Sequence, residues 1–145
     1  MPNVAEIVEQ KGRMIYTTRP ETSVLDATMK MNRERIGALV VMEGERVMGM
    51  FTERDVLRRV VGQGRRPEEV RVGEVMSSEV IYCLPETDVE EASRIMKERR
   101  IRHLPICDAE GKLHGLISIG DLNAFYAGHQ EQTIHYLQDY IYGRA

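Results

Sequence analysis

Residues 49–55 read GMFTERD, and residues 115–121 read GLISIGD, 66 positions further along the chain. Both follow the pattern Gly-h-h-Thr/Ser-x-x-Asp, in which h is an apolar residue. The pattern predicts a strand that ends at a hydroxyl residue, followed by a helix with an aspartate in its first turn. Because the same spacing occurs twice, we expect each copy to belong to one of two structural repeats.

The similarity between the two halves extends over most of the chain. Residues 14–17 (MIYT) resemble residues 80–83 (VIYC), and residues 20–22 and 85–87 both read PET. The offset between matching residues changes only between 65 and 66, so the insertions fall in turns while the elements keep their register. An ordered series of matches of this kind indicates an internal duplication.

Each repeat is predicted to fold as strand, helix, strand, strand and helix, which makes the protein an α/β protein. In the first repeat we expect strands at 14–17, 38–42 and 47–52, a helix capped by Ser23, and a helix at 55–61. In the second repeat we expect a helix capped by Asp88 and paired strands at 104–107 and 113–118.

The domain organisation follows from these elements. The glycines, arginines and proline of residues 63–73 mark a linker. The expected segments are a short helix near 4–9, the first repeat at 14–62, the linker at 63–79, the second repeat at 80–127 and a C-terminal helix at 128–145. A repeat of about 50 residues could hardly bury a core alone, so the halves should pack together around an approximate twofold axis with two equivalent clefts.

Composition excludes several classes of protein. The 145 residues carry 20 basic and 23 acidic side chains, a net charge of −3, which argues against a broad basic face for nucleic acid. No apolar run approaches the length of a membrane span or a signal peptide, so we expect a cytoplasmic protein. Cys83 and Cys107 lie in apolar runs and are expected to be small buried residues, since no ligand spacing for zinc accompanies them.

The repeated aspartates are the best candidates for chemistry. Asp55 and Asp121 could each accept two hydrogen bonds from a ribose 2′,3′-diol, while the hydroxyls of Thr52 and Ser118 could bind a phosphate oxygen. A helix N-terminus adds N–H groups and a dipole that favour an anion. The alternative is that all four residues only cap the helices, and a duplicated cap would produce the same pattern.

These motifs resemble the CBS (cystathionine β-synthase) domain. The resemblance covers roughly residues 14–127 and rests on the TERD motif at 52–55, the RHLPI motif at 102–106 and the tandem arrangement. It implies two repeats joined in a Bateman module, α/β in class, with an adenine nucleotide bound in clefts between the repeats. AMP is the first expectation, and ADP, ATP and NAD stay open.

Further site residues follow from the resemblance, position by position. It assigns Asp55 and Asp121 to ribose, and Thr52 and Ser118 to phosphate or ribose. The residues that would line the adenine pocket, through backbone groups and apolar contacts, are Tyr16, Thr17, Ala38, Leu39, Tyr82, Cys83, His103, Leu104 and Pro105.

Basic residues are distributed unequally between the two expected clefts. Arg102 and His103 precede the apolar strand of the second repeat, where family members place phosphate-contacting residues, whereas the first repeat has uncharged residues there. Arg54 and Arg58 could compensate from the helix that follows Thr52. The alternatives are a solvated helix face for the arginines and a core or surface role for His103.

No nucleophile–base pair, metal-ligand set or phosphate-binding loop is present, so we expect a non-enzymatic module without a metal. The favoured function is a nucleotide-responsive sensor that acts on an unidentified effector protein. The alternative is a nucleotide-independent scaffold that dimerises and docks on another protein. Nucleic-acid binding through the arginine-rich linker is disfavoured by the net charge.

The C-terminal region carries a stripe of large residues at helical spacing. Ile134, Leu137 and Ile141 follow this spacing, with Tyr136 and Tyr140 beside them. Such a stripe must pack on the module itself or on a second copy. Together with the habit of CBS pairs to assemble, it favours a homodimer.

Overall fold

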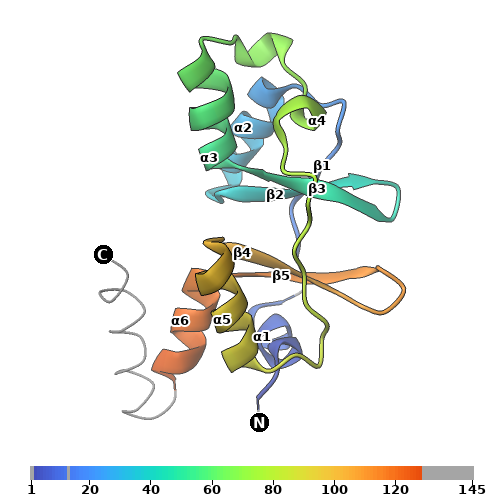
Figure 1. The fold of residues 1–145 in the computed structure, drawn as a ribbon, viewed down its shortest axis with the longest axis vertical. Coiled ribbons are helices and arrows are strands. Elements are labelled where there is room, and N and C mark those ends of the chain that lie inside the picture. The colour runs from blue at the N-terminus through green and yellow to red at the C-terminus, as the bar shows by residue number, and fades with distance from the viewer. Residues whose placement is uncertain (1, 13, 129–145) are drawn as a thin grey trace. The chain divides into compact units, whose positions relative to one another are not determined.

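The computed structural model describes residues 2–12 and 14–128, and Figure 1 shows its elements. In chain order they are α1 (Val4–Lys11), β1 (Thr17–Thr18), α2 (Val24–Glu34), β2 (Ala38–Glu43), β3 (Arg46–Thr52), α3 (Glu53–Asp55), η1 (Val56–Val60), η2 (Val61–Gln63), η3 (Pro67–Glu69), α4 (Val72–Val75), α5 (Val89–Arg99), β4 (His103–Cys107), β5 (Leu113–Ser118) and α6 (Ile119–Ala127). The expected C-terminal helix lies outside the described residues. The α/β class and the two repeats are confirmed.

The first repeat is built on a three-stranded sheet in the order β1-β2-β3, with β1 parallel and β3 antiparallel to β2. The first strand is shorter than the sequence predicted, because only Thr17 and Thr18 pair with β2. Leu39, Val41 and Phe51 are fully buried in a core that α2 completes. Burial of these side chains removes their apolar surface from water and fixes the register of β2 against β3.

The second repeat has the same arrangement but a smaller sheet, in which β4 pairs with β5. An isolated parallel bridge between Cys83 and Ile106 takes the place of the first strand, and the Cys83 amide donates to the Pro105 carbonyl (3.1 Å). Ser23 caps α2 as expected, since its Oγ accepts the Asp26 amide at 3.0 Å. Asp88 occupies the N-cap of α5, but its side chain makes no cap hydrogen bond, so that prediction was wrong.

The described residues form two compact units that do not coincide with consecutive halves of the chain. One unit consists of residues 2–12, 83–106 and 114–128, and the other consists of residues 14–82 and 107–113. The segment ahead of each repeat therefore packs on the other repeat. We call these segments, residues 2–12 and 70–76, the leader segments.

Matching hydrogen bonds hold the two leader segments. Val72 donates its amide to the Thr22 carbonyl at 2.8 Å, and Val4 donates to the Thr87 carbonyl at 2.9 Å. The next amides along each leader segment likewise bond to the carbonyls of the two prolines of the PET motifs. Because these are backbone bonds made at equivalent positions, the exchange of leader segments is a property of the duplicated fold and places α1 on the second repeat.

Candidate functional site

The carboxylate of Asp121 is fixed at the start of α6. Ser118 is the N-cap of this helix, its Oγ accepts the Asp121 amide at 3.1 Å, and Asp121 Oδ2 accepts the Ser118 amide at 2.8 Å. This reciprocal capping box satisfies backbone donors that the helix cannot satisfy itself. Ser118 and Asp121 therefore do cap the helix, but the cap uses only one carboxylate oxygen, and the Asp121 side chain stays 22% exposed.

A lysine from the first leader segment completes the surroundings of Asp121. Lys11, the last residue of α1, lies with its Nζ 2.7 Å from Asp121 Oδ2 and 2.8 Å from the Leu116 carbonyl oxygen. The sequence analysis did not include Lys11 among the site residues. No local signal could have found it, because 110 positions separate it from Asp121.

The structure brings Arg102 and His103 to the same helix start. The Ile119 amide, at the first position of α6, donates to the Arg102 carbonyl at 3.0 Å. Arg102 is exposed and His103 is half-buried. The region around the start of α6 therefore holds four of the expected site residues of the second repeat: Arg102, His103, Ser118 and Asp121.

The remaining expected residues of the second repeat are less accessible. Leu104 is fully buried in the core, so only its backbone can meet a ligand. Pro105 is buried, and its carbonyl already accepts the Cys83 amide. Cys83 is buried as well, whereas Tyr82 is 51% exposed.

The first repeat holds Asp55 by the same capping box. Asp55 Oδ2 accepts the Thr52 amide at 2.9 Å and the Thr52 hydroxyl at 3.3 Å, and Thr52 Oγ1 accepts the Asp55 amide at 3.4 Å. This carboxylate is more enclosed than its counterpart, since the Asp55 side chain is only 12% exposed. The helix expected at 55–61 is present but irregular: α3 passes into a π-helical turn, η1, and then into a 3₁₀ turn, η2.

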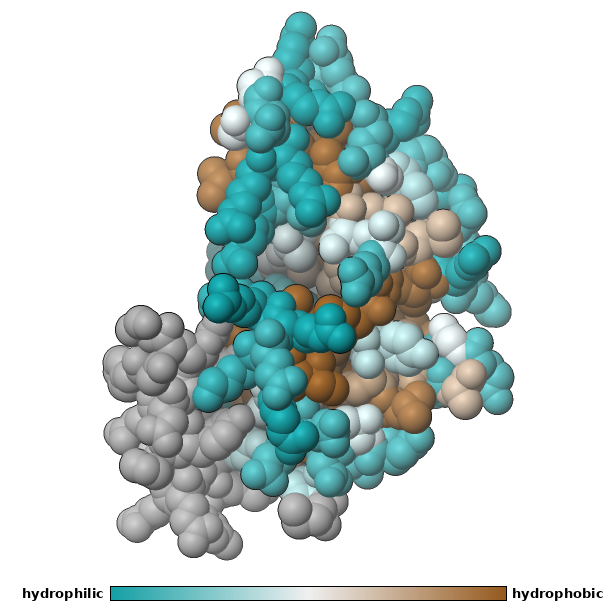
Figure 2. Space-filling model, in the orientation of Figure 1, coloured by the Kyte–Doolittle hydropathy of each residue, from teal (hydrophilic) through white to brown (hydrophobic). Residues whose placement is uncertain are grey.

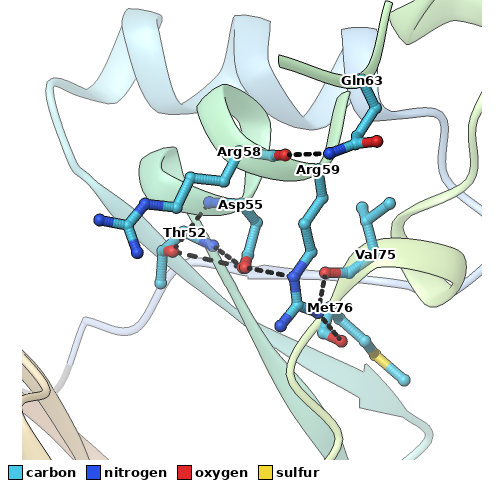
Figure 3. A network of polar contacts seen from close by, with 7 residues as sticks. All are labelled: Thr52, Asp55, Arg58, Arg59, Gln63, Val75 and Met76. Carbon is cyan, nitrogen blue, oxygen red and sulfur yellow. Dashed lines mark hydrogen bonds and ion pairs between the residues drawn. The ribbon is translucent and has the colours of Figure 1, made fainter. Parts of the chain in front are cut away.

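The cation next to Asp55 is Arg59, which was not among the site residues expected from the sequence. Arg59 Nε lies 3.8 Å from Asp55 Oδ1, and its Nη1 donates to the carbonyls of Val75 (3.0 Å) and Met76 (3.3 Å) in the second leader segment. Figure 3 shows this network, with Arg58 extending to the opposite side of Asp55. The i,i+4 spacing of Asp55 and Arg59 was a usable signal, because such residues are neighbours on a helix.

A further carboxylate, that of Glu53, lies at the start of the helix that contains Asp55. The Glu53 amide donates to the Gly37 carbonyl at 3.0 Å, and the Glu53 carboxylate lies over Gly37, 3.2 Å from where a Cβ would stand. Arg54 and Arg58 are exposed on the same helix. Of the expected adenine-lining residues, Ala38 and Leu39 are buried, Tyr16 and Thr17 are half-buried, and the Thr17 carbonyl already accepts Lys30 Nζ (2.5 Å).

Neither cysteine forms a disulfide. The pKa of the Cys107 thiol is raised, mainly by burial and secondly by the Asp108 carboxylate.

In the described part of the chain, no three His, Cys, Asp or Glu side chains gather in a way that could hold a metal ion. Between residues 2 and 128, Arg13 excepted, no helix combines the length and the apolar character that crossing a bilayer demands.

Comparisons with known proteins agree with the resemblance drawn from the motifs. A family model of the CBS domain matches residues 5–62 and 72–128. The mitochondrial CBS domain-containing protein CBSX3 of Arabidopsis thaliana is 33% identical over 150 residues, which cover 97% of this chain and 72% of the relative. The CBS domain-containing protein YhcV of Bacillus subtilis is 36% identical over 119 residues, which cover 82% and 84%. A solved structure of a protein with CBS domains from Burkholderia ambifaria has a TM-score of 0.83 at 43% identity, covering 89% of this chain and 97% of that one.

Proposed function

The chain belongs to the CBS domain family, and we propose that it is a regulatory module whose second repeat binds an adenine nucleotide at Asp121. CBS-domain proteins are commonly regulatory and nucleotide-binding. AMP is the ligand we expect first, with ADP, ATP and NAD as the other adenine ligands to compare. The stand-alone CBS relatives support a non-enzymatic role, in which nucleotide occupancy changes how the module contacts an effector protein.

The single observation that carries this proposal is the set of polar groups around the start of α6. Asp121 presents a partly exposed carboxylate that can accept hydrogen bonds from a ribose diol. Lys11 and Arg102 bring positive charge to the same region, and the N-terminal end of α6 adds its dipole. A diol acceptor next to cationic groups is the chemistry that a phosphorylated nucleoside requires.

Isothermal titration of AMP into the wild-type protein and into the Asp121→Ala variant tests the proposal. Loss of hydrogen bonds to a charged acceptor costs about 1.5–3 kcal/mol, so we expect AMP binding to weaken by roughly 10–100-fold. Asp88→Ala is the matched control, because Asp88 also begins a helix of the second repeat but makes no cap hydrogen bond.

Two results would contradict the proposal. Unchanged AMP affinity in both Asp55→Ala and Asp121→Ala would show that neither carboxylate binds ribose. Absence of saturable binding by AMP, ATP and NAD to folded, ligand-free protein would favour the nucleotide-independent scaffold that docks on another protein.

We also propose that the module is a homodimer, as some of its structural relatives are multimeric. The support comes from four large apolar side chains that the helices of the first repeat expose: Leu25, Met29, Leu57 and Val61. The matching positions of the second repeat hold smaller or polar residues: Glu90, Arg94, Asn123 and Ala127. Figure 2 shows hydrophilic side chains over most of the visible surface with apolar side chains exposed among them.

Light scattering on the wild-type protein and on Leu57→Glu tests the homodimer. We expect the wild-type mass to be twice 16.6 kDa and the variant to dissociate, because a carboxylate in an apolar contact is costly to desolvate. Leu84→Glu is the control, since Leu84 is an exposed leucine of the other unit. A monomeric wild-type mass, or a dimeric Leu57→Glu, would contradict this surface as the interface.

A further inference from the structure

Lys11 is bound to the carboxylate that we assign to ribose, although it comes from the opposite end of the sequence. Its ammonium group makes two hydrogen bonds, to Asp121 Oδ2 at 2.7 Å and to the Leu116 carbonyl at 2.8 Å. The Lys11 side chain is 34% exposed, so it is open to solvent on one side. A ribose diol that binds both carboxylate oxygens of Asp121 must therefore compete with Lys11 for Oδ2.

The first repeat shows that the fold itself does not require this lysine. The Met50 carbonyl, which is equivalent to that of Leu116, accepts a backbone amide instead, from Ser77 at 2.9 Å. A Cβ at Gly49 would meet Met76, and a Cβ at Gly115 would meet Val8, so Met76 and Val8 occupy equivalent places.

After these places the two chains differ: α1 stays helical to Lys11, whereas α4 ends at Val75 and Ser77 then pairs with Met50. The lysine is thus a feature of the second repeat alone.

The chemistry of the contact determines which ligands can replace it. Asp121 Oδ2 already accepts the Ser118 amide and the Lys11 ammonium, and the ammonium–carboxylate bond is charge-assisted and therefore stronger than a bond from a neutral hydroxyl. A nucleoside would separate Lys11 from its carboxylate without offering it another anion. A nucleotide carries a phosphate that can pair with the released ammonium.

We propose that Lys11 makes the second-repeat site selective for phosphorylated over unphosphorylated adenosine. When a ribose diol occupies Asp121, Lys11 exchanges the carboxylate for the phosphate of the same ligand. The inference rests on the proposed function, which it deepens by naming the residue that reads the phosphate. Arg102 adds positive charge in the same region, but among the described residues it is Lys11 that pairs with Asp121.

The experiment compares AMP with adenosine by isothermal titration, taking as the site's affinity the component that Asp121→Ala removes. In Lys11→Met we expect AMP to bind more weakly and adenosine more tightly, so that their affinity ratio falls roughly tenfold or more. Lys11→Arg should keep the wild-type ratio, because it preserves the charge. Lys97→Met is the control: it removes an exposed lysine of the same unit for which no ion pair with Asp121 is found among the described residues.

Lys11→Gln keeps hydrogen-bond donors but removes the charge, and it should lower the ratio as Lys11→Met does. The variants should fold, because backbone bonds from Val4 and Ala5 hold the first leader segment independently of Lys11. If AMP binds through Asp121 and the ratio is unchanged in either uncharged variant, the role of Lys11 is refuted while the proposed function stands. If wild-type protein binds no AMP, the proposed function fails and this inference falls with it.

Discussion

Asp55 and Asp121 are held by the same capping box, yet the cation that accompanies each one arrives from the opposite direction. Arg59 belongs to the helix that Asp55 begins, and it reaches outward to two carbonyls of the second leader segment. Lys11 belongs to the first leader segment, and it reaches inward to Asp121. Each cation thus connects a leader segment to a site carboxylate. In the first repeat the cation belongs to the helix that carries the carboxylate, and in the second repeat it belongs to the leader segment.

The comparison separates what duplication preserves from what it leaves free to vary. The capping box is preserved because the backbone donors at a helix start need partners in both copies. The charged residues around it differ between the two copies. Gly37 and Glu53 in the first repeat stand where Arg102 and Ile119 stand in the second. The second site is therefore better suited to an anion.

The largest test of this comparison uses the glycines that face the leader segments. A Cβ on Gly49 would stand 2.5 Å from the Ser77 carbonyl oxygen, a backbone atom, whereas one on Gly115 would stand 2.7 Å from Val8 Cγ2. Overpacking costs about 1–3 kcal/mol, and we expect Gly49→Ala near the upper end and Gly115→Ala near the lower, because a side chain can shift more easily than backbone. Urea unfolding monitored by circular dichroism measures both free energies of unfolding.

A double variant distinguishes contact from general damage. If Val8 packs on Gly115, the cost of Gly115→Ala combined with Val8→Ala will be less than the sum of the single costs. Met76→Ala should not relieve Gly49→Ala in the same way, since the Ser77 carbonyl stays in place. Additive costs at Gly115 would contradict the packing of the first leader segment on the second repeat.

Much of the fold could be predicted because it depends on local patterns. The repeated GhhT/SxxD motif located β3, β5 and the capped helix starts, and Ser23 was identified as a cap from its type and position. The first strand was mispredicted: residues 14–16 have strand-like side chains, but the parallel pairing with β2 begins only at Thr17. Asp88 shows the limit of a type-based rule, since its side chain leaves the cap unmade.

The site could be predicted only in part, because its charges come from distant segments. Within each motif the hydroxyl residue and the aspartate are three positions apart, and their mutual hydrogen bonds follow from that spacing. The pairs are Thr52 with Asp55 and Ser118 with Asp121. Lys11 reaches its partner only because the leader segments are exchanged, and no sequence pattern reveals which repeat a leader segment packs on. The adenine-lining role of the expected apolar residues stays a prediction.

The smallest expected effect concerns the ion pair between Arg65 and Glu74 of the second leader segment. It tests whether charge on this segment contributes to the stability of the protein. Hydrogen bonding to the Arg71 amide first, and then to the Arg65 side chain, lowers the pKa of Glu74 below its ordinary value of 4.5. Because the folded pKa is the lower one, the stabilisation is complete above the unfolded pKa and is lost as the pH falls through the folded pKa. Glu74→Gln should therefore unfold at a slightly lower urea concentration than the wild type at pH 7, and the difference should disappear in acid.

Arg65→Gln sharpens this test, because it removes the ion pair (2.8 Å) but leaves the backbone bond from Arg71 (2.8 Å). The folded pKa of Glu74 should then rise towards 4.5, so the loss of stability in acid should be smaller than in the wild type and complete at a higher pH. A wild-type acid profile in Arg65→Gln would mean that the backbone bond alone sets the pKa. In that case Glu74 would act only as the acceptor of its capping box, as Glu6 does with Asn3 in the first leader segment.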